Sequence, residues 1–546
     1  MDLPRRRFLA KAGFTFASIL AANTLISAAH AVEIDGISAI EQFIVDRGNF
    51  SISGIELRNR AALEKIYQAR NYAPLWTTTD HPTYTSVVVA QRLANASLLG
   101  LEPSKYYGRL LNQIATESYQ SNLLEFEILM TDSIISYFDD LAHGATEPPS
   151  EEAGWLLKRA RIDTGSIAQG FFNGEKSLSE TIDELHPTHH RFNRLLNALH
   201  DYHAIADNGG WPKISKGASV TYGDRSPRIA ELRQRLLASQ DLQYNTSTDY
   251  ELFDTELSEA LIRFQTRHGL ESDGVLGPNT LHALNVPVEE RIAQLNLNLD
   301  RWRWLSRDLG YSNITVNTAG YEMDVTLHGA VAMNMNVIVG KPKHATPLFS
   351  DSMEHMVFNP SWYVPRSIAR KLLKKEAKKP GYLASNNFEA RDKSTNQPVA
   401  FSQLTPFDKD PEFFSAKYWL RQKPGDDNAL GRLKFMFPNK YSIYLHDTNS
   451  PELFAESERA FSHGCVRLEQ PEKLAELLLT SDGHSYSDIQ HYQQLDTTKK
   501  VNLRNQLPVH LTYQTAWISD EGVLNFREDI YKHDRHALAQ LDNNHT

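Results

Sequence analysis

The sequence predicts a multidomain α+β protein, in which a helical scaffold domain, a small three-helix module and a mostly β domain with an inserted segment follow one another. Three observations lead to this prediction. The chain has 546 residues, whereas a single hydrophobic core stops growing at roughly 250–300. Apolar residues recur at helical spacing up to about residue 211, and a period of two begins after residue 310. Hydrophobic residues make up 41% of the chain and charged residues 23%, which is typical of globular domains.

The first element is an export signal over residues 1–31. Three arginines at 5–7 precede Phe8, an apolar run follows from about residue 12, and Ala-His-Ala at 29–31 closes it. These are the regions of a secretory signal, and consecutive arginines before Phe-Leu resemble the twin-arginine type. We expect cleavage after residue 31, with an uncleaved anchor or an amphipathic surface helix as the alternative. No other stretch approaches the ~18–20 apolar residues that span a bilayer, so no transmembrane span is expected after cleavage.

Residues 32–215 are expected to form the helical scaffold domain. Helical apolar spacing dominates there, as over residues 123–141 and 192–203. Pro and Gly interrupt this spacing near residues 147–149 and 208–212. Because no group of residues in this region suggests chemistry, we predict a structural role for it.

Residues 222–287 are expected to form a three-helix module. One stripe of a helix over 257–268 consists of Leu257, Leu261, Phe264 and His268. Gly269 follows as the C-cap of this helix, and Pro278 is placed to open the next one. Residues 288–310 then read as a linker helix.

Residues 311–510 are expected to form the mostly β domain. Apolar residues alternate over 331–339, which is the period of a strand with one buried face, and the turn at 328–329 suggests a hairpin leading into it. An insertion over about 366–430 is a lid candidate, because loops longer than ~15 residues are often lids or binding elements. Its Lys-rich helix is either a solvated face or a surface for an anionic polymer. Residues 511–546 form a C-terminal segment.

Charge and cysteine content narrow the function. The net charge of −10 argues against nucleic acid as a partner, because nucleic-acid binding depends on neutralising phosphates. The single cysteine, Cys465, cannot form an intrachain disulfide. It is either a buried apolar residue or a reactive thiol. In an oxidising exported compartment, an unpaired cysteine suggests chemistry.

The surroundings of Cys465 suit a nucleophile. A strand is expected over residues 441–446, with Tyr444 and His446 on one face. Gly464 lets the backbone turn sharply before the thiol and leaves N–H groups open to a developing oxyanion. The neighbouring histidine and arginine are suited to lowering the thiol pKa from its free value of about 8.5.

Two other roles for Cys465 remain open on the residues alone. Free cysteine is among the most buried residue types, so a structural thiol is one alternative. A zinc site from His446, His463 and Cys465 is another, although the usual paired cysteine or histidine ligands are absent.

A longer pattern around these residues is similar to that of a known family. His446, a 15-residue spacer and the run Ser-His-Gly-Cys-Val-Arg at 462–467 resemble the signature of YkuD-type L,D-transpeptidases. The phrase at 357–365 is similar to that family's strand and turn, and residues 264–285 resemble the type 1 peptidoglycan-binding domain. The whole layout resembles the large YcbB-like (LdtD-like) subgroup. One departure is Arg467, because the family's motif often ends in Asn, and it leaves the donor contacts at that position open.

The resemblance implies an acyl transfer through Cys465. The thiol attacks the carbonyl between the third and fourth residues of a peptidoglycan tetrapeptide stem, releases the terminal D-alanine and leaves a thioester. The acyl group then passes to the third-residue side-chain amine of another stem, which gives a 3-3 cross-link in cell wall biogenesis. No metal or cofactor is implied.

The same resemblance assigns roles to other residues. His446 acts as the base and then as the proton donor, and Asp447 orients its imidazole through the backbone carbonyl. His463 is a second candidate for tuning the thiolate, and the Gly464 N–H is expected to donate to the oxyanion. Four further residues are expected to contact the substrate: Arg467, Ser462, Tyr444 and Trp362.

Partners and a compartment follow from the resemblance as well. Peptidoglycan stem peptides and glycan are the expected partners, carbapenem-type β-lactams are expected to acylate Cys465, and the periplasm is the expected location. An L,D-carboxypeptidase and an enzyme that attaches a lipoprotein to the wall would use the same thioester. A non-catalytic wall-binding protein, in which the module at 222–287 is the function, is the alternative from another class.

Overall fold

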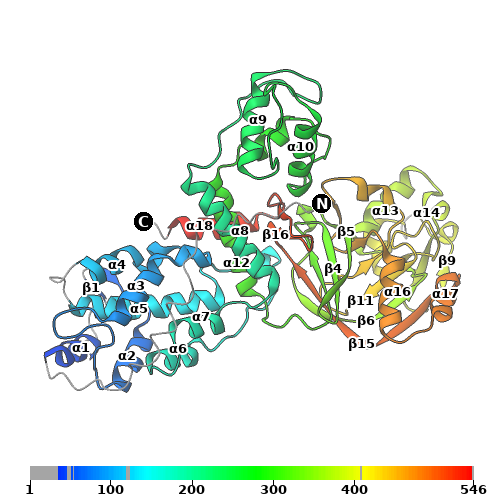
Figure 1. The fold of residues 1–546 in the computed structure, drawn as a ribbon. Coiled ribbons are helices and arrows are strands. Elements are labelled where there is room, and N and C mark those ends of the chain that lie inside the picture. The colour runs from blue at the N-terminus through cyan, green and yellow to red at the C-terminus, as the bar shows by residue number, and fades with distance from the viewer. Residues whose placement is uncertain (1–34, 46–50, 53, 118–122, 406–408, 544–546) are drawn as a thin grey trace. The chain divides into compact units, whose positions relative to one another are not determined.

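The computed structural model describes residues 35–45, 51–52, 54–117, 123–405 and 409–543. The chain divides into two compact units, one formed by residues up to 145 together with 161–187, the other by 146–160 together with the residues from 188 onward (Figure 1). The predicted signal at 1–31 lies outside the described residues. Among the helices of the described ranges, none combines the length and the apolar character that a bilayer crossing needs.

The first unit is helical, as predicted. Its helices are α1 (Asp35–Val45), α2 (Arg60–Ala69), α3 (Tyr84–Ala94), α4 (Gly108–Glu117), α5 (Leu123–His143), α6 (Thr164–Phe172) and α7 (Leu178–Leu185). The long helix α5 is buried on most of its surface. Its Glu127 carboxylate accepts hydrogen bonds from the backbone N–H of Leu75 (2.6 Å) and of Trp76 (3.0 Å) and from the Tyr67 hydroxyl (2.8 Å). This buried charge is therefore fully solvated by the protein itself.

The compact unit ends earlier than the predicted scaffold range of 32–215. Helix α8 (His190–Asp207) belongs to the second unit, because it packs along α12 (Val288–Trp304). Stacking of His189 on Trp302, with ring centroids 4.7 Å apart, fixes the start of α8 on that helix. A helical period alone does not reveal which partner a helix packs against.

The three-helix module is confirmed. Its helices are α9 (Pro227–Ala238), α10 (Thr255–Arg267) and α11 (Pro278–Leu284). The predicted stripe of α10 is buried in the core of the module. At the C-terminal end of α10, the Arg267 guanidinium donates to both carboxylate oxygens of Asp241, each at 2.6 Å, and both side chains are buried.

The β domain is built on one sheet. Among the described residues this sheet has nine strands, in the order β13-β5-β14-β12-β11-β6-β15-β3-β4. The predicted hairpin is present as β4 (Glu322–Leu327) and β5 (Ala330–Gly340). Because β5 pairs with β4 through its first half and with β14 and β13 through its second, the sheet closes on itself.

The remaining strands of this sheet include β15, a strand late in the chain that has a neighbouring strand on both sides. They are β3 (Asn313–Asn317), β6 (Ser350–Phe358), β11 (Leu433–Met436), β12 (Leu445–His446), β13 (Ala460–Ser462), β14 (Val466–Leu468) and β15 (Lys499–Thr512). Strand β15 lies between β6 and β3 and runs past the predicted domain end at 510. The residues after it form a hairpin of β16 (Ala516–Ile518) and β17 (Leu524–Phe526) and the helix α18 (His533–Asn543).

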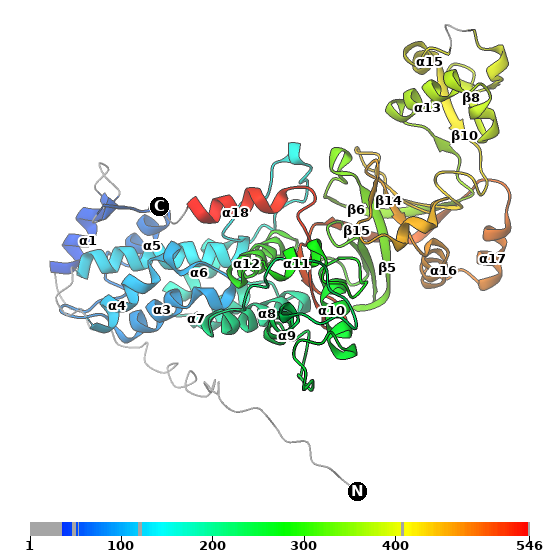
Figure 2. The ribbon, with the colours of Figure 1, turned by 90° about the horizontal axis from the view of Figure 1, so that it is seen from above.

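The predicted lid is a folded subdomain rather than a long loop. Its elements are β7 (Trp362–Tyr363), α13 (Arg366–Lys378), α14 (Tyr382–Ser385), β8 (Phe388–Asp392), β9 (Pro398–Val399), α15 (Pro411–Lys417) and β10 (Tyr418–Gln422). The strands form a separate sheet in the order β7-β10-β8-β9. In Figure 2, α13, α15, β8 and β10 form a lobe of their own. Its core includes Leu373, Leu383 and Phe414.

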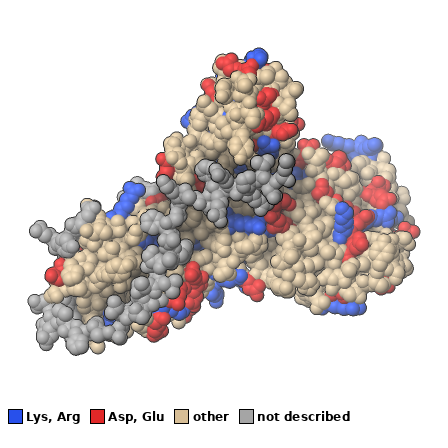
Figure 3. All heavy atoms as spheres, viewed as in Figure 1, with Lys and Arg blue, Asp and Glu red and all other residues tan. Residues whose placement is uncertain are grey.

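The Lys-rich helix of the lid is α13. Its Ala369 and Leu373 are buried, whereas most of its cations are exposed, and basic side chains gather at the surface of the lid in Figure 3. Arg366 and Arg370 both pair with Glu412 of α15. The helix is thus amphipathic and is held to the lid by its apolar face.

Replacing Asp241 by Asn is expected to destabilise the module by about 3–5 kcal/mol, because the buried Arg267 guanidinium would lose its counter-charge. Hydrogen–deuterium exchange over α9 and α10 measures this local stability. The matched control is Asp249→Asn, which breaks the exposed Arg225–Asp249 pair of the same module and should cost about 1 kcal/mol or less. Equal protection in both variants would contradict the assigned role of the buried pair.

Candidate active site

The pairing of β12 with β14 brings the strand of the predicted base beside the turn of the predicted nucleophile. The two strands are parallel, with Leu445 opposite Val466 and His446 opposite Arg467. Leu445 and Val466 are fully buried on the core side. Since side chains alternate along a strand, His446 and Arg467 face the other way. Cys465 directly precedes β14, and its side chain packs in part against the core.

The predicted strand over 441–446 is shorter in the structure. Only Leu445 and His446 pair as strand β12, because Ser442 adopts a left-handed conformation with φ 57° and ends the extended run. The Asn439 side chain fills this turn, donating to the backbone carbonyls of Phe437 and Ile443. Tyr444 and His446 still share a face, with ring centroids 5.6 Å apart.

The nucleophile lies in a turn that three residues hold in shape. The Ser462 hydroxyl donates to the Cys465 carbonyl (2.6 Å) and accepts from the Gly464 N–H (3.0 Å). The Thr346 hydroxyl donates to the Gly464 carbonyl (2.8 Å). Gly464 has φ 119°, and a Cβ there would lie 3.2 Å from the Ile443 side chain. Glycine is therefore the residue that this turn accepts.

The imidazole of His446 is buried and oriented. Its Nδ1 lies 2.5 Å from the Asp447 carbonyl oxygen. A carbonyl can only accept, so Nδ1 carries the proton and Nε2 has a free lone pair. Burial, with a smaller contribution from the Arg467 charge, lowers the pKa of His446 to about 3. The ring is thus a neutral base at physiological pH.

The Asp447 carboxylate faces away from this imidazole. It accepts from the backbone N–H of Arg432 (2.7 Å) and of Thr448 (2.6 Å). Asp447 therefore acts on His446 through its backbone, and its side chain fixes the strand ends around the site.

The Cys465 thiol is half-buried, and burial raises its pKa. Three groups oppose this effect by favouring the thiolate. The backbone and hydroxyl of Tyr444 lower the thiol pKa by hydrogen bonding, and Lys434 and Arg467 add positive charge, while the thiol itself donates to the Ser442 carbonyl oxygen, 3.6 Å from the sulfur. The Trp362 side chain in turn hydrogen-bonds the Tyr444 hydroxyl. Trp362 and Tyr444, both predicted to line the substrate groove, are thus linked to the sulfur.

Two predicted site residues, Ser462 and Gly464, make contacts other than those expected, and the contacts of His463 leave its predicted role untested. Ser462 is buried, with 3% of its surface exposed, so it shapes the turn instead of contacting a substrate. The Gly464 N–H donates to Ser462 and is not available to an oxyanion, which leaves the Cys465 N–H as the candidate donor of this turn. His463 stacks on His344, with centroids 4.7 Å apart, and its Nε2 lies 3.4 Å from the Lys371 ammonium of α13.

Sequence reasoning missed Lys434. It lies on β11 directly opposite His446, and its ammonium is 3.7 Å from the centroid of the Tyr444 ring. The signal was present, because Leu433 and Phe435 on either side are buried core residues. A lone lysine between them had to point to the opposite face, where the site lies.

Metal ligation was the other chemistry considered for this cluster. Within the ranges that the structure describes, no group of three or more His, Cys, Asp or Glu side chains could hold a metal ion. His463, one of the three ligands considered, packs on His344.

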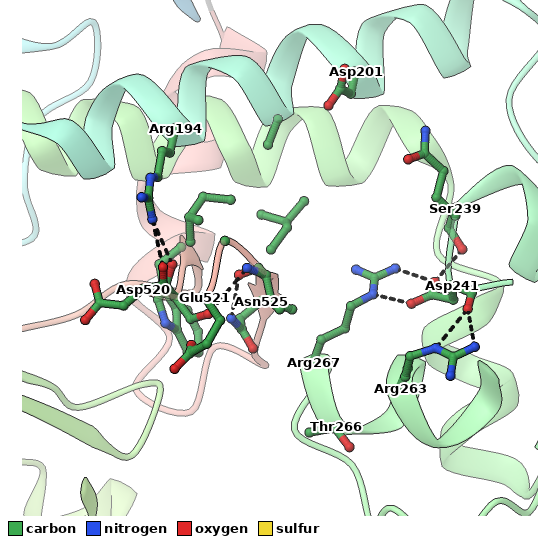
Figure 4. A pocket seen from close by; sticks show the side chains of 18 of the residues that line it. Arg194, Asp201, Ser239, Asp241, Arg263, Thr266, Arg267, Asp520, Glu521 and Asn525 are labelled. Carbon is green, nitrogen blue, oxygen red and sulfur yellow. Dashed lines mark hydrogen bonds and ion pairs between the residues drawn. The ribbon is translucent and has the colours of Figure 1, made fainter. Parts of the chain in front are cut away.

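A cleft of the second unit does not include this site. It has a volume of about 1320 Å³ and is lined by α8, the three-helix module, β4 and the β16–β17 hairpin, not by the Cys465 turn. Figure 4 shows several of its polar groups joined to one another by hydrogen bonds and ion pairs, whereas Asp201 is drawn without such a contact. Arg263 donates to the Asp241 carbonyl, Arg267 to the Asp241 carboxylate, and Arg194 to the Asp520 carbonyl.

Three regions of the chain match known domain families. Residues 312–499 match the L,D-transpeptidase catalytic domain of the YkuD family. Residues 61–199 match a scaffold domain, and residues 225–284 match the "Putative peptidoglycan binding domain".

Two curated proteins are similar in part. A "Putative L,D-transpeptidase" of Haemophilus influenzae is 34% identical over 236 residues, which are 42% of this chain and 47% of that protein. The "N-acetylmuramoyl-L-alanine amidase CwlM" of Mycobacterium tuberculosis is 35% identical over 80 residues, 13% of this chain and 20% of that protein. The chain therefore spans about half the length of the first relative and a fifth of the second.

Solved structures with remote similarity include an L,D-transpeptidase from Mycobacterium smegmatis, with 13% identity, a TM-score of 0.17 and coverage of 37% of this chain and 58% of that one. The structure of the Ldtfm-avibactam carbamoyl enzyme has 11% identity, a TM-score of 0.18 and coverage of 58% and 98%. Residues 312–499 form an L,D-transpeptidase catalytic domain of the YkuD family, in a chain that also carries a scaffold domain and a peptidoglycan-binding domain.

Proposed function

We propose that this protein cross-links peptidoglycan by cysteine acyl transfer from a tetrapeptide stem to the third-residue amine of a second stem. One observation carries the proposal. His446, with its proton fixed on Nδ1 by the Asp447 carbonyl, lies on β12, and Cys465 directly precedes β14, the parallel strand that pairs with β12. A neutral imidazole with a free Nε2 beside a thiol is the arrangement that nucleophilic catalysis needs.

In the first half-reaction, the Cys465 sulfur attacks the carbonyl between the third and fourth stem residues as its proton passes to His446 Nε2. The developing oxyanion accepts a hydrogen bond from the Cys465 N–H. Collapse of the tetrahedral intermediate breaks the C–N bond, and the imidazolium returns the proton to the leaving D-alanine amine. A thioester remains on the enzyme.

In the second half-reaction, the side-chain amine of the acceptor stem attacks the thioester. His446 takes a proton from the amine and returns it to the leaving sulfur, so that an amide forms and the thiol is restored. Water competes with the amine for the thioester, and the lid is proposed to limit its access. Transfer to water would give an L,D-carboxypeptidase, and transfer to a protein amine would attach a lipoprotein.

Arg467 is proposed to bind an anionic group of the donor stem. Its side chain is half-buried, burial lowers its pKa, and within the described residues its Nε has no hydrogen-bond partner. A desolvated guanidinium with open donor capacity favours a carboxylate. Trp362 and Tyr444, which reach the sulfur through the Tyr444 hydroxyl, are proposed as the walls of the groove.

The compartment and the remaining partners complete the proposal. Peptidoglycan lies outside the cytoplasmic membrane, so the signal at 1–31 is proposed to export the chain to the periplasm by the twin-arginine route. The match of residues 225–284 to a peptidoglycan-binding domain supports peptidoglycan stems and glycan as partners. Carbapenem-type β-lactams are proposed to acylate Cys465, because their strained amide presents a carbonyl to the same nucleophile.

Incubation of the mature protein with purified disaccharide-tetrapeptide tests the proposed reaction. Mass spectrometry should show a cross-linked dimer that has lost one D-alanine, and no product with Cys465→Ser, because an alcohol is a much weaker nucleophile than a thiol here. Tripeptide as the only product would show that the carboxypeptidase reaction takes place instead of cross-linking. Unchanged substrate with the wild-type protein would contradict catalysis on this donor and favour the wall-binding alternative.

Intact-mass measurement after exposure to a carbapenem is expected to show one adduct on the wild-type protein and none on Cys465→Ser. The physical reason is that acylation needs the thiolate and nothing from the acceptor site. The proposed inhibitor chemistry is wrong if cross-linking activity persists at full drug concentration without any adduct.

Ser462→Ala is expected to slow acylation about 10- to 100-fold, because the turn would lose both hydrogen bonds that set the position of the sulfur. Stopped-flow acylation by a carbapenem gives the rate directly. Ser457→Ala, in the exposed segment before β13, is the matched control and should react at the wild-type rate. A wild-type rate for Ser462→Ala as well would contradict the role of Ser462 in positioning the sulfur.

A further inference from the structure

Lys434 carries a charge that the structure leaves without a carboxylate. The residue is half-buried on β11, and burial lowers its pKa. Within the described residues, the acidic group that acts on its ammonium is the Cys465 thiol and not an Asp or Glu side chain. A desolvated cation costs stability unless an anion compensates it. The group positioned to do so is the thiolate of Cys465.

The contact with Tyr444 links this cation to the sulfur by a second path. The ammonium lies 3.7 Å from the centre of the Tyr444 ring, and the hydroxyl of that ring donates to Cys465. A cation over the face of a phenol withdraws electron density and makes its hydroxyl a stronger donor. Burial raises the pKa of Tyr444, so the hydroxyl keeps its proton and remains a donor.

The sheet register places a second cation on the other side of the base. Lys434 of β11 lies opposite His446 of β12, which lies opposite Arg467 of β14. Both cations lower the pKa of His446 and that of Cys465. They therefore favour a thiolate next to a neutral imidazole and disfavour an imidazolium.

We infer that Lys434 is a positioning residue of the active site, whose charge stabilises the Cys465 thiolate directly and through the Tyr444 hydroxyl. The inference rests on the proposed role of Cys465 as the nucleophile. The charge then acts as the thiol proton passes to His446 Nε2, because it stabilises the negative charge that develops on the sulfur, and His446 later returns that proton to the leaving amine.

The titratable and charged groups around the sulfur come from three strands and the turn. They are Lys434 of β11, Tyr444 and His446 at β12, Arg467 of β14 and His463 of the nucleophile turn. Burial, followed by the charges of His344 and Lys371, lowers the pKa of His463. Lys434 and Arg467 are therefore the permanent positive charges that act on the thiol.

The test is the pH dependence of Cys465 alkylation by iodoacetamide in the full mature protein, which needs no peptidoglycan substrate. Lys434→Met keeps the length of the side chain and removes the charge. Its alkylation at pH 7 is expected to fall about three- to tenfold, with the profile displaced to higher pH, because the thiolate loses an adjacent cation. Lys434→Arg should stay within about twofold of the wild-type protein.

Lys440→Met is the matched control. Lys440 is exposed and lies 5.1 Å from the ring of Tyr441, so it has the same kind of cation–ring contact away from the thiol. Its alkylation profile should be that of the wild-type protein. Thermal unfolding separates folding from charge, because Lys434→Met should unfold at the wild-type temperature or above it, as expected when an unpaired buried charge is removed.

An unchanged alkylation profile for Lys434→Met would overturn the inference. If that variant also raised KM for the tetrapeptide donor, Lys434 would be a substrate contact instead. Failure of the proposed function is distinguishable, since it would appear as product formation by Cys465→Ser or as absence of product from the wild-type protein, whatever the alkylation profile.

Discussion

The parallel pairing of β12 with β14 is the constraint on which the site depends. It aligns His446 with Arg467, turns both away from the core that Leu445 and Val466 fill, and brings the Cys465 turn next to β12. A slip of one residue in this register would turn the base into the core, because side chains alternate between the two faces of a sheet. The turn at 462–465 and the Asn439 turn fix that register from both ends by side-chain hydrogen bonds to the backbone.

Buried charges of this protein fall into two kinds. Some have full sets of partners, because the buried Glu127 is surrounded by donors and Arg267 donates to both carboxylate oxygens of Asp241. Others, such as Arg235 with its backbone carbonyl acceptor, have burial that lowers the pKa. In the site, Lys434 and Arg467 are desolvated without a carboxylate in contact. Departures from full satisfaction of this kind are expected at functional sites, where stability is given up for reactivity. A thiolate on Cys465 would compensate the charge of Lys434, and an anionic substrate group would compensate that of Arg467.

The sequence was sufficient for the features that depend on local patterns. The helical stripe of α10, the β4–β5 hairpin and the helical and β regions follow from periodicity, which local sequence encodes. The Cys465 motif and His446 follow from a long signature.

The partner of α8 and the position of β15 between β6 and β3 did not follow from the sequence, because both depend on which distant surfaces meet. Lys434 was missed for a related reason, since its role arises from the β11–β12 register and not from its neighbours in sequence. The Gly464 N–H was assigned to the oxyanion because a pattern cannot show that Ser462 already accepts its hydrogen bond.

The proposed mechanism requires that His446 is a neutral imidazole with its proton on Nδ1. Nitrogen chemical shifts of ¹⁵N-histidine-labelled protein, assigned by comparison with His446→Gln, measure the tautomer directly. The account predicts a protonated Nδ1 and an unprotonated Nε2 for His446, with no titration between about pH 5 and 9, because burial lowers the pKa of this ring to about 3. A His446 signal that is doubly protonated at pH 7, or that carries its proton on Nε2, would contradict it.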